Sequence, residues 1–184
     1  CRMHMTEKLL SPEVDFIIYL IRSYKISNSL IYFNKFVNLI SKFKKKPKIL
    51  YVSSGAIYGS LKKGLKVNEK KKISIKNINN FSGYKKKYAK EKLFMEEKFK
   101  KLSKKGYKIS IARCFTFVGK SILKYNYAIA DIINSIRGKK KIILKNSHNV
   151  FRSYMHSKDM CRWLIKILKN SNNKCPIYNV GSEH

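Results

Sequence analysis

Tyr88 and Lys92 are the residues of this sequence whose types and spacing best suit proton transfer. They stand four residues apart in a segment with helical character, so both side chains fall on one helical face. A nearby ammonium favours the phenolate and lowers a phenol pKa that starts at about 10. Such a shift suits a general acid/base, because this kind of group works best when its pKa is close to the working pH.

The spacing alone does not single out this pair, because lysine is abundant and the same spacing recurs at Tyr58/Lys62 and Tyr154/Lys158. Context favours the first pair. A strand expected just upstream ends in two hydroxyl residues, Ser53 and Ser54. In parallel α/β sheets, ligands bind beyond the carboxyl ends of the strands. We therefore expect this strand end and the face of the Tyr88 helix to converge on one crevice.

The elements that must position these residues alternate between strands and helices. Short apolar runs predict buried strands, and apolar residues at helical spacing predict helices. Strands or extended pieces are expected at 14–20, 48–52, 108–112, 142–144, 152–156 and 177–180. Helices are expected at 30–40, 82–104, 128–138 and 158–169, the last capped by Ser157, with a loop at 59–80. The alternation predicts an α/β fold with a parallel sheet.

The charge of the chain is strongly positive. It has 184 residues, enough for one domain or part of one, and a formal net charge of +32 from 42 Lys and Arg against 10 Asp and Glu. Such a charge would normally indicate a polyanionic partner. The lysines, however, are dispersed in short runs beside abundant Asn, Ile, Tyr and Phe, as coding bias in an AT-rich genome produces. We expect a solvated basic surface that binds nucleic acid loosely at low salt, without a specific nucleic-acid partner.

Cysteine usage and hydropathy bound the setting of the protein. The four cysteines lie far apart without C-x-x-C spacing, so we expect no metal site and no disulfide framework. No secretory signal opens the sequence, and the longest strongly apolar run, 16–21, is too short to cross a bilayer. A cytoplasmic protein without a membrane partner is expected. Because the sequence starts at Cys1 without methionine and stops just after an expected strand, we also expect both ends to be cut.

Several motifs stand in an order that resembles one enzyme family. VSSGAIYG is similar to S-S-x-x-V-Y-G, YAKEKLFMEE to Y-x-x-x-K-x-x-x-E, IARCFTFVG to R-x-x-N-x-x-G, RSYMHSKDM to R-x-x-x-x-V-x-D, and YNVGSE to a late Y-N-V-G strand. With the apolar strand VDFIIYL ahead of them, these motifs resemble those of the extended short-chain dehydrogenase/reductases, specifically the NAD-dependent epimerase/dehydratases that act on nucleotide sugars.

The resemblance implies a fold and an assembly. The fold would be α/β, a partial Rossmann-type, doubly wound parallel sheet with a small C-terminal substrate-binding portion. Residues 1–119 would form the C-terminal part of the NAD-binding Rossmann domain, and residues 120–184 a partial substrate-binding region with returning Rossmann elements. The resemblance also implies a homodimer that pairs through the helices at 30–43 and 82–104.

The resemblance also assigns roles to residues. Tyr88 would be the acid/base for a sugar hydroxyl while hydride passes to the nicotinamide of NAD or NADP. Lys92 would bind the cofactor ribose and lower the pKa of Tyr88, and Ser54 would hydrogen-bond the same sugar oxygen. The other implied contacts are with the cofactor for Ser53, Cys114 and Phe115, and with the substrate for Thr116 and for Arg152, which would bind its diphosphate.

Departures from the family's pattern narrow the reaction. Family dehydratases place an Asp-Glu pair directly after the hydroxyl residue, where this chain has Gly55 and Ala56. The sequence therefore disfavours 4,6-dehydration and leaves epimerisation, reduction or a related oxidation. Thr116 replaces the usual Asn and donates one hydrogen bond where an amide donates two. The family's His-x-Ala-Ala is replaced by bulky residues that are expected to crowd the cofactor, Tyr19, Ile21 and Arg22.

The family's glycine-rich turn, which receives the pyrophosphate of a dinucleotide, is absent from the 184 residues. We therefore expect a fragment of an enzyme that by itself binds NAD poorly and is inactive. Two hypotheses stay open. One is an NAD-dependent nucleotide-sugar oxidoreductase that works through Ser54, Tyr88 and Lys92; the other is a basic binding module that kept the fold and lost the chemistry. The sequence does not specify the sugar, the nucleotide, or NAD against NADP.

Overall fold

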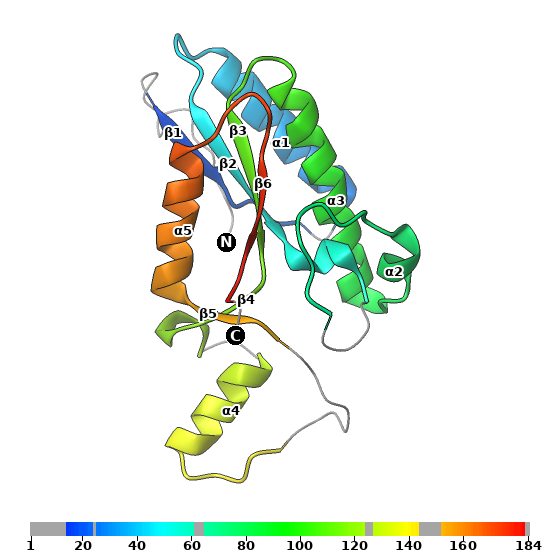
Figure 1. Cartoon of the computed structure of the whole chain (residues 1–184), viewed down its shortest axis with the longest axis vertical. Coiled ribbons are helices and arrows are strands. Elements are labelled where there is room, and N and C mark those ends of the chain that lie inside the picture. The colour runs from blue at the N-terminus through cyan, green and yellow to red at the C-terminus, as the bar shows by residue number, and fades with distance from the viewer. Residues whose placement is uncertain (1–13, 24, 61–64, 124–126, 144–151, 183–184) are drawn as a thin grey trace.

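The structure, a computed structural model, describes residues 14–23, 25–60, 65–123, 127–143 and 152–182. Its centre is a four-stranded parallel sheet with the strand order β1-β2-β3-β6 (Figure 1). The strands are β1 (Phe16–Tyr19), β2 (Lys48–Ser54), β3 (Ile109–Cys114) and β6 (Ile177–Val180). Helices cover both faces of this sheet, so the architecture is that of a partial, doubly wound Rossmann-type fold, as expected.

Three long helices flank the sheet. They are α1 (Ile26–Ser41), α3 (Gly83–Ser103) and α5 (Ser157–Lys169). Figure 1 shows α1 and α3 on one side of the sheet and α5 on the other. Because each parallel strand returns to the same edge through such a crossover, all four strands end on one side of the molecule.

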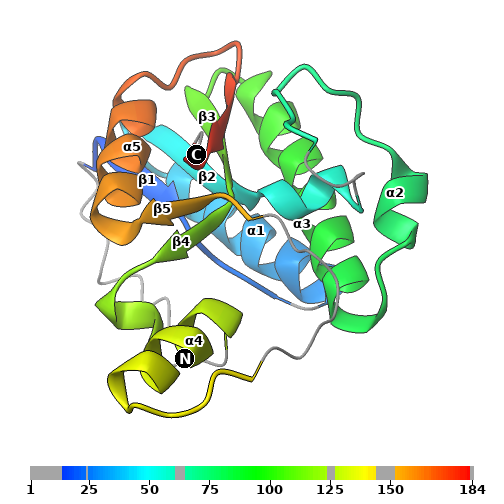
Figure 2. The same cartoon turned by 60° about the horizontal axis from the view of Figure 1, so that its bottom comes forward.

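A smaller group of elements lies beyond the carboxyl ends of the strands. A second sheet of two parallel strands joins β4 (Thr116–Val118) to β5 (Tyr154–His156), and α4 (Ala128–Arg137) lies past it (Figure 2). The remaining pieces are α2 (Ile75–Asn79) and the 3-10 turns η2 (Gly55–Tyr58) and η3 (Lys120–Ile122). Within the described ranges, no helix has both the length and the apolar character needed to span a membrane.

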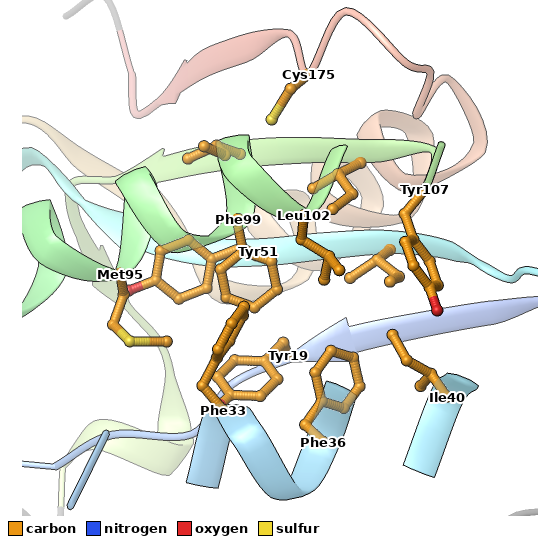
Figure 3. Close-up of a cluster of buried hydrophobic side chains, with 13 residues drawn as sticks. Tyr19, Phe33, Phe36, Ile40, Tyr51, Met95, Phe99, Leu102, Tyr107 and Cys175 are labelled. Carbon is orange, nitrogen blue, oxygen red and sulfur yellow. The ribbon is translucent and has the colours of Figure 1, made fainter. Parts of the chain in front are cut away.

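The core between the sheet and helices α1 and α3 is rich in aromatic side chains (Figure 3). Tyr51 of β2 stacks on Phe99 of α3 with ring centroids 4.5 Å apart, and Tyr19 meets the edge of Phe99 at 5.0 Å. Each such contact adds about 0.5–1.5 kcal/mol to the stability gained by burial. On the other face, Leu50 packs in a separate cluster with Met160 of α5. The alternation of Leu50 and Tyr51 follows from the two-residue period of a strand.

Most expected elements are confirmed in type and place, and the differences concern short segments. The segment 59–80 contains α2, whose first turn is capped by Ser74. The strand expected at 142–144 is wrong for residues 142 and 143, which belong to no strand, and residue 144 lies outside the described residues. Strand β4 was not anticipated, because three residues are too few to show a periodic pattern.

The cap of α5 also differs from the expectation. His156, not Ser157, occupies the N-cap, and its Nδ1 accepts a hydrogen bond from the backbone nitrogen of Lys158 at 3.4 Å. Ser157 is already inside the helix. Asp159 lies in the first turn, where its carboxylate is stabilised by the helix dipole.

Candidate active site

Ser54 is the last residue of β2, at the edge where the strands end. In the sheet register it lies beside Cys114, the last residue of β3. Its hydroxyl accepts a hydrogen bond from the backbone nitrogen of Ala56 at 3.2 Å and so caps the turn η2. The same side chain is hydrogen-bonded to Tyr88 of α3. The strand end and the helix face that the sequence pointed to therefore lie side by side.

Tyr88 is half-buried in the first part of α3. Burial raises the pKa of its phenol above the ordinary value, and the hydrogen bond from Ser54 and the charge of Arg22 oppose this shift. The carboxylate of Glu91 and the thiol of Cys114 add to it. The net direction is opposite to the lowering expected from the sequence, because loss of solvation outweighs the favourable contacts.

Lys92 lies one helical turn further along, beneath Tyr88. Its side chain is 4% exposed, and its Nζ donates to the backbone oxygen of Val52 at 3.1 Å. The ammonium is 5.1 Å from the ring centroid of Tyr51 and 5.8 Å from that of Tyr88. Burial lowers the pKa of Lys92. An ammonium has three donors, and in the described part of the chain Val52 takes one of them, which leaves two for a ligand.

Cys114 and Phe115 follow directly at the end of β3. Burial raises the pKa of the Cys114 thiol to about 12, so the thiol stays protonated and is not a nucleophile at neutral pH. The Phe115 side chain lies against two glycines: a Cβ added at Gly55 would lie 2.7 Å from its ring, and one added at Gly181 would lie 3.2 Å from its Cβ. Phe115 therefore fills the floor beside Ser54 and leaves no room for a side chain at position 55.

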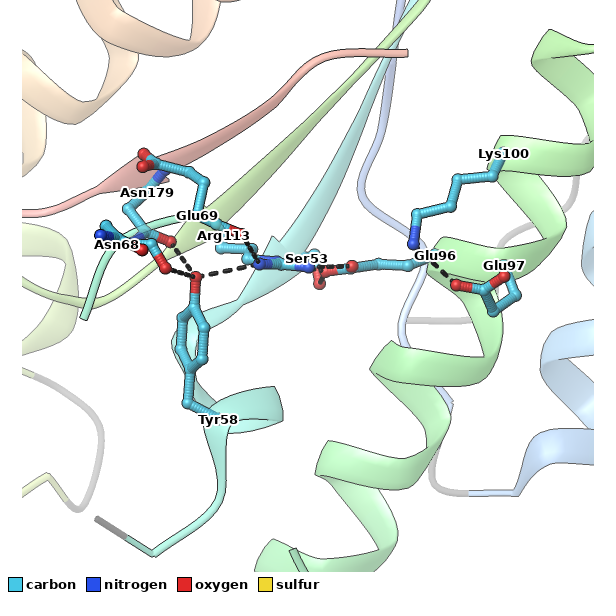
Figure 4. Close-up of polar contacts among 9 residues, drawn as sticks. All are labelled: Ser53, Tyr58, Asn68, Glu69, Glu96, Glu97, Lys100, Arg113 and Asn179. Atoms are coloured by element: carbon cyan, nitrogen blue, oxygen red, sulfur yellow. Dashed lines mark hydrogen bonds and ion pairs between the residues drawn. The ribbon is translucent and has the colours of Figure 1, made fainter. Parts of the chain in front are cut away.

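Ser53 points away from this group. Its side chain is 2% exposed, and its hydroxyl donates to Oε1 of Glu96 at 2.6 Å. Glu96 also holds Arg113 through both carboxylate oxygens, with Nη2 to Oε2 at 2.8 Å and Nε to Oε1 at 3.1 Å (Figure 4). The cofactor contact assigned to Ser53 stays a prediction, and its hydroxyl is committed to a buried ion pair.

The buried ion pair belongs to a network that ties the carboxyl ends of the strands to α3. Nη1 of Arg113 donates to the hydroxyl of Tyr58 at 2.9 Å, and that hydroxyl donates to Oδ1 of Asn179 in β6 at 2.8 Å (Figure 4). Glu96 and Arg113 are the acid of the Y-x-x-x-K-x-x-x-E motif and the arginine of the R-x-x-N motif. The motifs marked both residues, but nothing in their spacing says that the two side chains pair.

Thr116 and Arg152 lie on the smaller sheet. Thr116 opens β4 and is paired in register with Tyr154 of β5, while Arg152 is exposed just ahead of β5. Across the described residues, the side chain of Arg152 makes no hydrogen bond or ion pair. The structure does not bring Arg152 into contact with Ser54 or Tyr88, and the substrate contacts of Thr116 and Arg152 stay predictions.

Arg22 is a member of the site that sequence reasoning treated only as bulk. Its guanidinium carbon lies 5.0 Å from the ring centroid of Tyr88 and 5.4 Å from that of Tyr84. The sequence did hold a clue: Arg22 follows β1 at a position where the family pattern His-x-Ala-Ala has a small residue. Among the residues that the structure describes, no group of His, Cys, Asp and Glu side chains could hold a metal ion.

Several solved structures with a similar fold are nucleotide-sugar enzymes by their titles. UDP-N-acetylglucosamine 4-epimerase from Bacillus cereus superposes with a TM-score of 0.74 at 23% identity, over 94% of this chain and 58% of that chain. RMD from Pseudomonas aeruginosa, complexed with NADPH, superposes with a TM-score of 0.73 at 19% identity, over 94% of this chain and 62% of that chain. For dTDP-glucose 4,6-dehydratase from Bacillus anthracis, in complex with NAD, the TM-score is 0.70 at 19% identity, over 92% of this chain and 52% of that chain. The chain thus spans a little over half the length of these structures and shares their fold.

The superpositions show the fold, and sequence comparison shows the family. No curated protein matches the sequence significantly. The sequence model of one family, described as the NAD dependent epimerase/dehydratase family, matches residues 20–181. That match contains the motifs from VSSGAIYG to the YNVG at 178–181 and covers most of the 184 residues. The chain therefore belongs to the NAD-dependent epimerase/dehydratase family.

Proposed function

We propose that this chain is part of an NAD(P)-dependent enzyme that oxidises a ring hydroxyl of a nucleotide sugar, as an epimerase or a reductase, through Ser54, Tyr88 and Lys92. The observation that carries the proposal is the hydrogen bond between the side chains of Ser54 and Tyr88, with the Lys92 ammonium 5.8 Å from the Tyr88 ring. Family membership and the nucleotide-sugar enzymes among the structural neighbours support it. They do not favour a basic binding module.

The residues around Tyr88 suit the nicotinamide end of an NAD(P) cofactor. The two donors of Lys92 that Val52 leaves unused match the vicinal hydroxyls of a ribose. Bound there, NAD(P) would supply a hydride acceptor and donor for the sugar carbon. No glycine-rich phosphate-binding motif occurs in the sequence, so this chain offers no cradle for the pyrophosphate. We propose that the chain by itself binds NAD weakly and is inactive.

In the proposed mechanism, each side chain acts on one sugar oxygen. Ser54 hydrogen-bonds the hydroxyl and fixes its position against the phenol. Tyr88, as phenolate, accepts the hydroxyl proton while the carbon is oxidised, and as phenol it returns the proton when the carbonyl is reduced. Lys92 stabilises the phenolate by its charge from below the ring. Because burial raises the pKa of Tyr88, the phenol form predominates at neutral pH before ligands bind.

The floor of the site supports a reaction other than dehydration. Eliminating water from a sugar needs an additional acid and base beside the hydroxyl residue, and the chain has Gly55 there. A side chain at position 55 would collide with the Phe115 ring, whose nearest carbon lies 2.7 Å from an added Cβ. We therefore propose that the enzyme epimerises or reduces its sugar substrate. We also propose that Thr116 and Arg152 contact the substrate, in a substrate-binding region formed mainly by residues 120–184.

Replacing Tyr88 tests the proposed function. In the complete natural protein, Tyr88→Phe is expected to lower kcat/KM for the nucleotide sugar by about 10²–10⁴-fold, because the proton has no acceptor. The free energy of unfolding is expected to change by less than about 1 kcal/mol, since the ring is kept. Tyr107→Phe is the matched control, because Tyr107 lies at the opposite end of the sheet. Turnover that survives Tyr88→Phe would remove Tyr88 from the mechanism.

We also propose that two copies pair through α1 and α3 in the cytoplasm. Ile31 and Tyr32 on the outer side of α1 are 52% and 39% exposed, which is apolar surface that a second copy would cover. Analytical ultracentrifugation of the complete protein measures this association. A monomer at all accessible concentrations would contradict it.

A further inference from the structure

Arg22 lies just beyond β1 and reaches over the first part of α3. Its guanidinium carbon is 5.0 Å from the Tyr88 ring centroid and 5.4 Å from the Tyr84 ring centroid. The two tyrosine rings are stacked on each other, with centroids 5.9 Å apart and planes 21° apart. Both distances fall inside the range of about 6 Å over which a cation is attracted to an aromatic face. One cation thus covers both rings.

The other cation of the site is placed differently. The Lys92 ammonium donates to the Val52 backbone oxygen and is 5.8 Å from the Tyr88 centroid, farther than the guanidinium of Arg22. Burial lowers the pKa of Lys92, whereas an arginine stays protonated throughout the working range of an enzyme. Arg22 therefore provides a positive charge at Tyr88 that does not vary with pH.

We propose that Arg22 is a positioning residue for Tyr88: stacked on the pair of tyrosine rings, it fixes the orientation of the phenol and stabilises its phenolate with a permanent charge. The proposal deepens the proposed function and rests on it for the catalytic meaning of Tyr88. The stacking geometry itself stands on the contacts of Arg22, Tyr84 and Tyr88 alone. The large side chain at position 22 therefore supplies a positive charge to the site.

The groups that face Tyr88 show why one more cation matters. From the surrounding elements these are Arg22 after β1, Ser54 of β2, Cys114 of β3, and Glu91 and Lys92 of α3. Burial, Glu91 and Cys114 raise the pKa of the phenol, and Ser54 and Arg22 lower it. Without Arg22, the hydrogen bond from Ser54 would be the main interaction opposing burial, so the phenolate would become harder to form.

A site-specific titration tests the charge coupling directly. Tyr88 is replaced by 3-fluorotyrosine in the 184-residue chain, and the ¹⁹F shift, which reports this one phenol, is followed against pH over the range in which circular dichroism shows a folded chain. The ionisation midpoint is expected to move to higher pH in the order Arg22→Lys, Arg22→Gln, Arg22→Glu. Arg137→Gln, which removes an exposed charge on α4, is the matched control and is expected to leave the midpoint in place.

The series keeps the test decisive if one variant fails to fold, because any two folded members can be compared, and circular dichroism identifies them. Equal midpoints in the parent and in Arg22→Gln or Arg22→Glu would overturn the proposal. So would a shift of the same size in Arg137→Gln, because it would show a general effect of net charge.

The activity of the complete protein tests the catalytic meaning. Arg22→Gln is expected to move the ascending limb of the kcat/KM pH profile to higher pH and to lower kcat/KM about tenfold near neutral pH, and Arg22→Lys to restore most of the loss. An unchanged profile would overturn the role of Arg22 in the reaction. If the proposed function is wrong, Tyr88→Phe will still turn over the nucleotide sugar. The ¹⁹F titration tests the coupling between Arg22 and Tyr88 independently of that result.

Discussion

At the residue scale, Phe115 controls what can stand beside Ser54. Its ring lies over Gly55 at a distance that no Cβ could share, and it stacks with Tyr58 at 6.3 Å between centroids. The Cβ of Phe115 is also held against Gly181. The ring is thus fixed from several sides, and the glycine at position 55 is required by packing.

A double-mutant cycle measures this packing. Gly55→Ala is expected to lower the free energy of unfolding by about 1–3 kcal/mol, because the added methyl group overpacks the site. In a Phe115→Leu background, the same substitution is expected to cost clearly less, since the ring that it strikes is gone. Chemical denaturation of the four chains gives the coupling energy. Equal costs in both backgrounds would show that Phe115 does not constrain position 55.

At the element scale, α3 is the part of the fold that carries the site and also holds it to the sheet. Its first part presents Tyr88 and Lys92, and its middle presents Glu96 to Arg113 of β3. Both members of that ion pair are almost fully buried, at 0% and 3% exposed. A buried pair of this kind adds little stability compared with apolar residues of similar volume, but removing one partner leaves the other charge buried and unpaired.

Breaking the pair is therefore expected to be costly. Glu96→Gln leaves the Arg113 charge buried without its counter-ion and is expected to lower the free energy of unfolding by about 3–5 kcal/mol. Glu97→Gln is the matched control: Glu97 is exposed and pairs with Lys100 at 2.7 Å on the helix surface, so a change below about 0.5 kcal/mol is expected. Urea unfolding measures both, and similar costs for the two variants would contradict this account.

A second acidic residue of α3 gives the chain a pH-dependent strain. Glu91 is 1% exposed; its Oε1 accepts from Ser29 of α1 at 2.7 Å, and its Oε2 has no hydrogen-bond partner in the described part of the chain. Burial raises the pKa of Glu91, with Lys92 and Ser29 opposing. Folding favours the protonated acid, because the pKa of Glu91 is higher in the folded chain than in the unfolded chain, where it is about 4.5. The stability that this residue contributes at low pH is therefore lost as the pH rises from the unfolded-state pKa through the folded-state pKa.

Glu91→Gln removes this titration and keeps an oxygen for Ser29. Relative to the parent, the variant's free energy of unfolding is expected to rise between about pH 4 and pH 8 by on the order of 1–3 kcal/mol, the cost of a buried ionised group with an unmet acceptor. Urea unfolding at a series of pH values measures the difference. A difference that stays flat, as expected for Glu97→Gln, would show that Glu91 is not the source.

At the scale of the whole molecule, the chain combines the fold of its family with a strongly positive net charge. It spans 62% of one structural neighbour and 52% of another, and no glycine-rich turn occurs in its sequence. The net charge of +32 attracts any polyphosphate through screened, non-specific contacts. Dinucleotide binding by this chain must therefore be separated from simple anion binding.

Calorimetry with NAD makes that separation. At physiological salt the 184-residue chain is expected to bind NAD with a Kd of about 1 mM or weaker, because its sequence holds no glycine-rich turn for the pyrophosphate. Tripolyphosphate is the control ligand, and any binding at low salt is expected to be shared by both and to vanish as salt is added. A micromolar, salt-resistant Kd specific to NAD would contradict the prediction.

The sequence by itself determined the α/β class, the long helices, the main strands and the order of the motifs. These depend on local periodicity: the two-residue alternation of Leu50 and Tyr51 and the helical spacing of Tyr88 and Lys92 are properties of neighbouring residues. It also predicted the proximity of Ser54 and Tyr88, because parallel strands must end on one edge.

Only the tertiary structure decided what each polar group meets. It turned Ser53 toward Glu96, joined Glu96 to Arg113, laid Phe115 over Gly55 and set Arg22 above Tyr88. It also reversed the expected direction of the pKa shift of Tyr88. Each of these results comes from the balance of burial and contact between segments far apart in the chain, and that balance is a property of packing that local sequence does not encode.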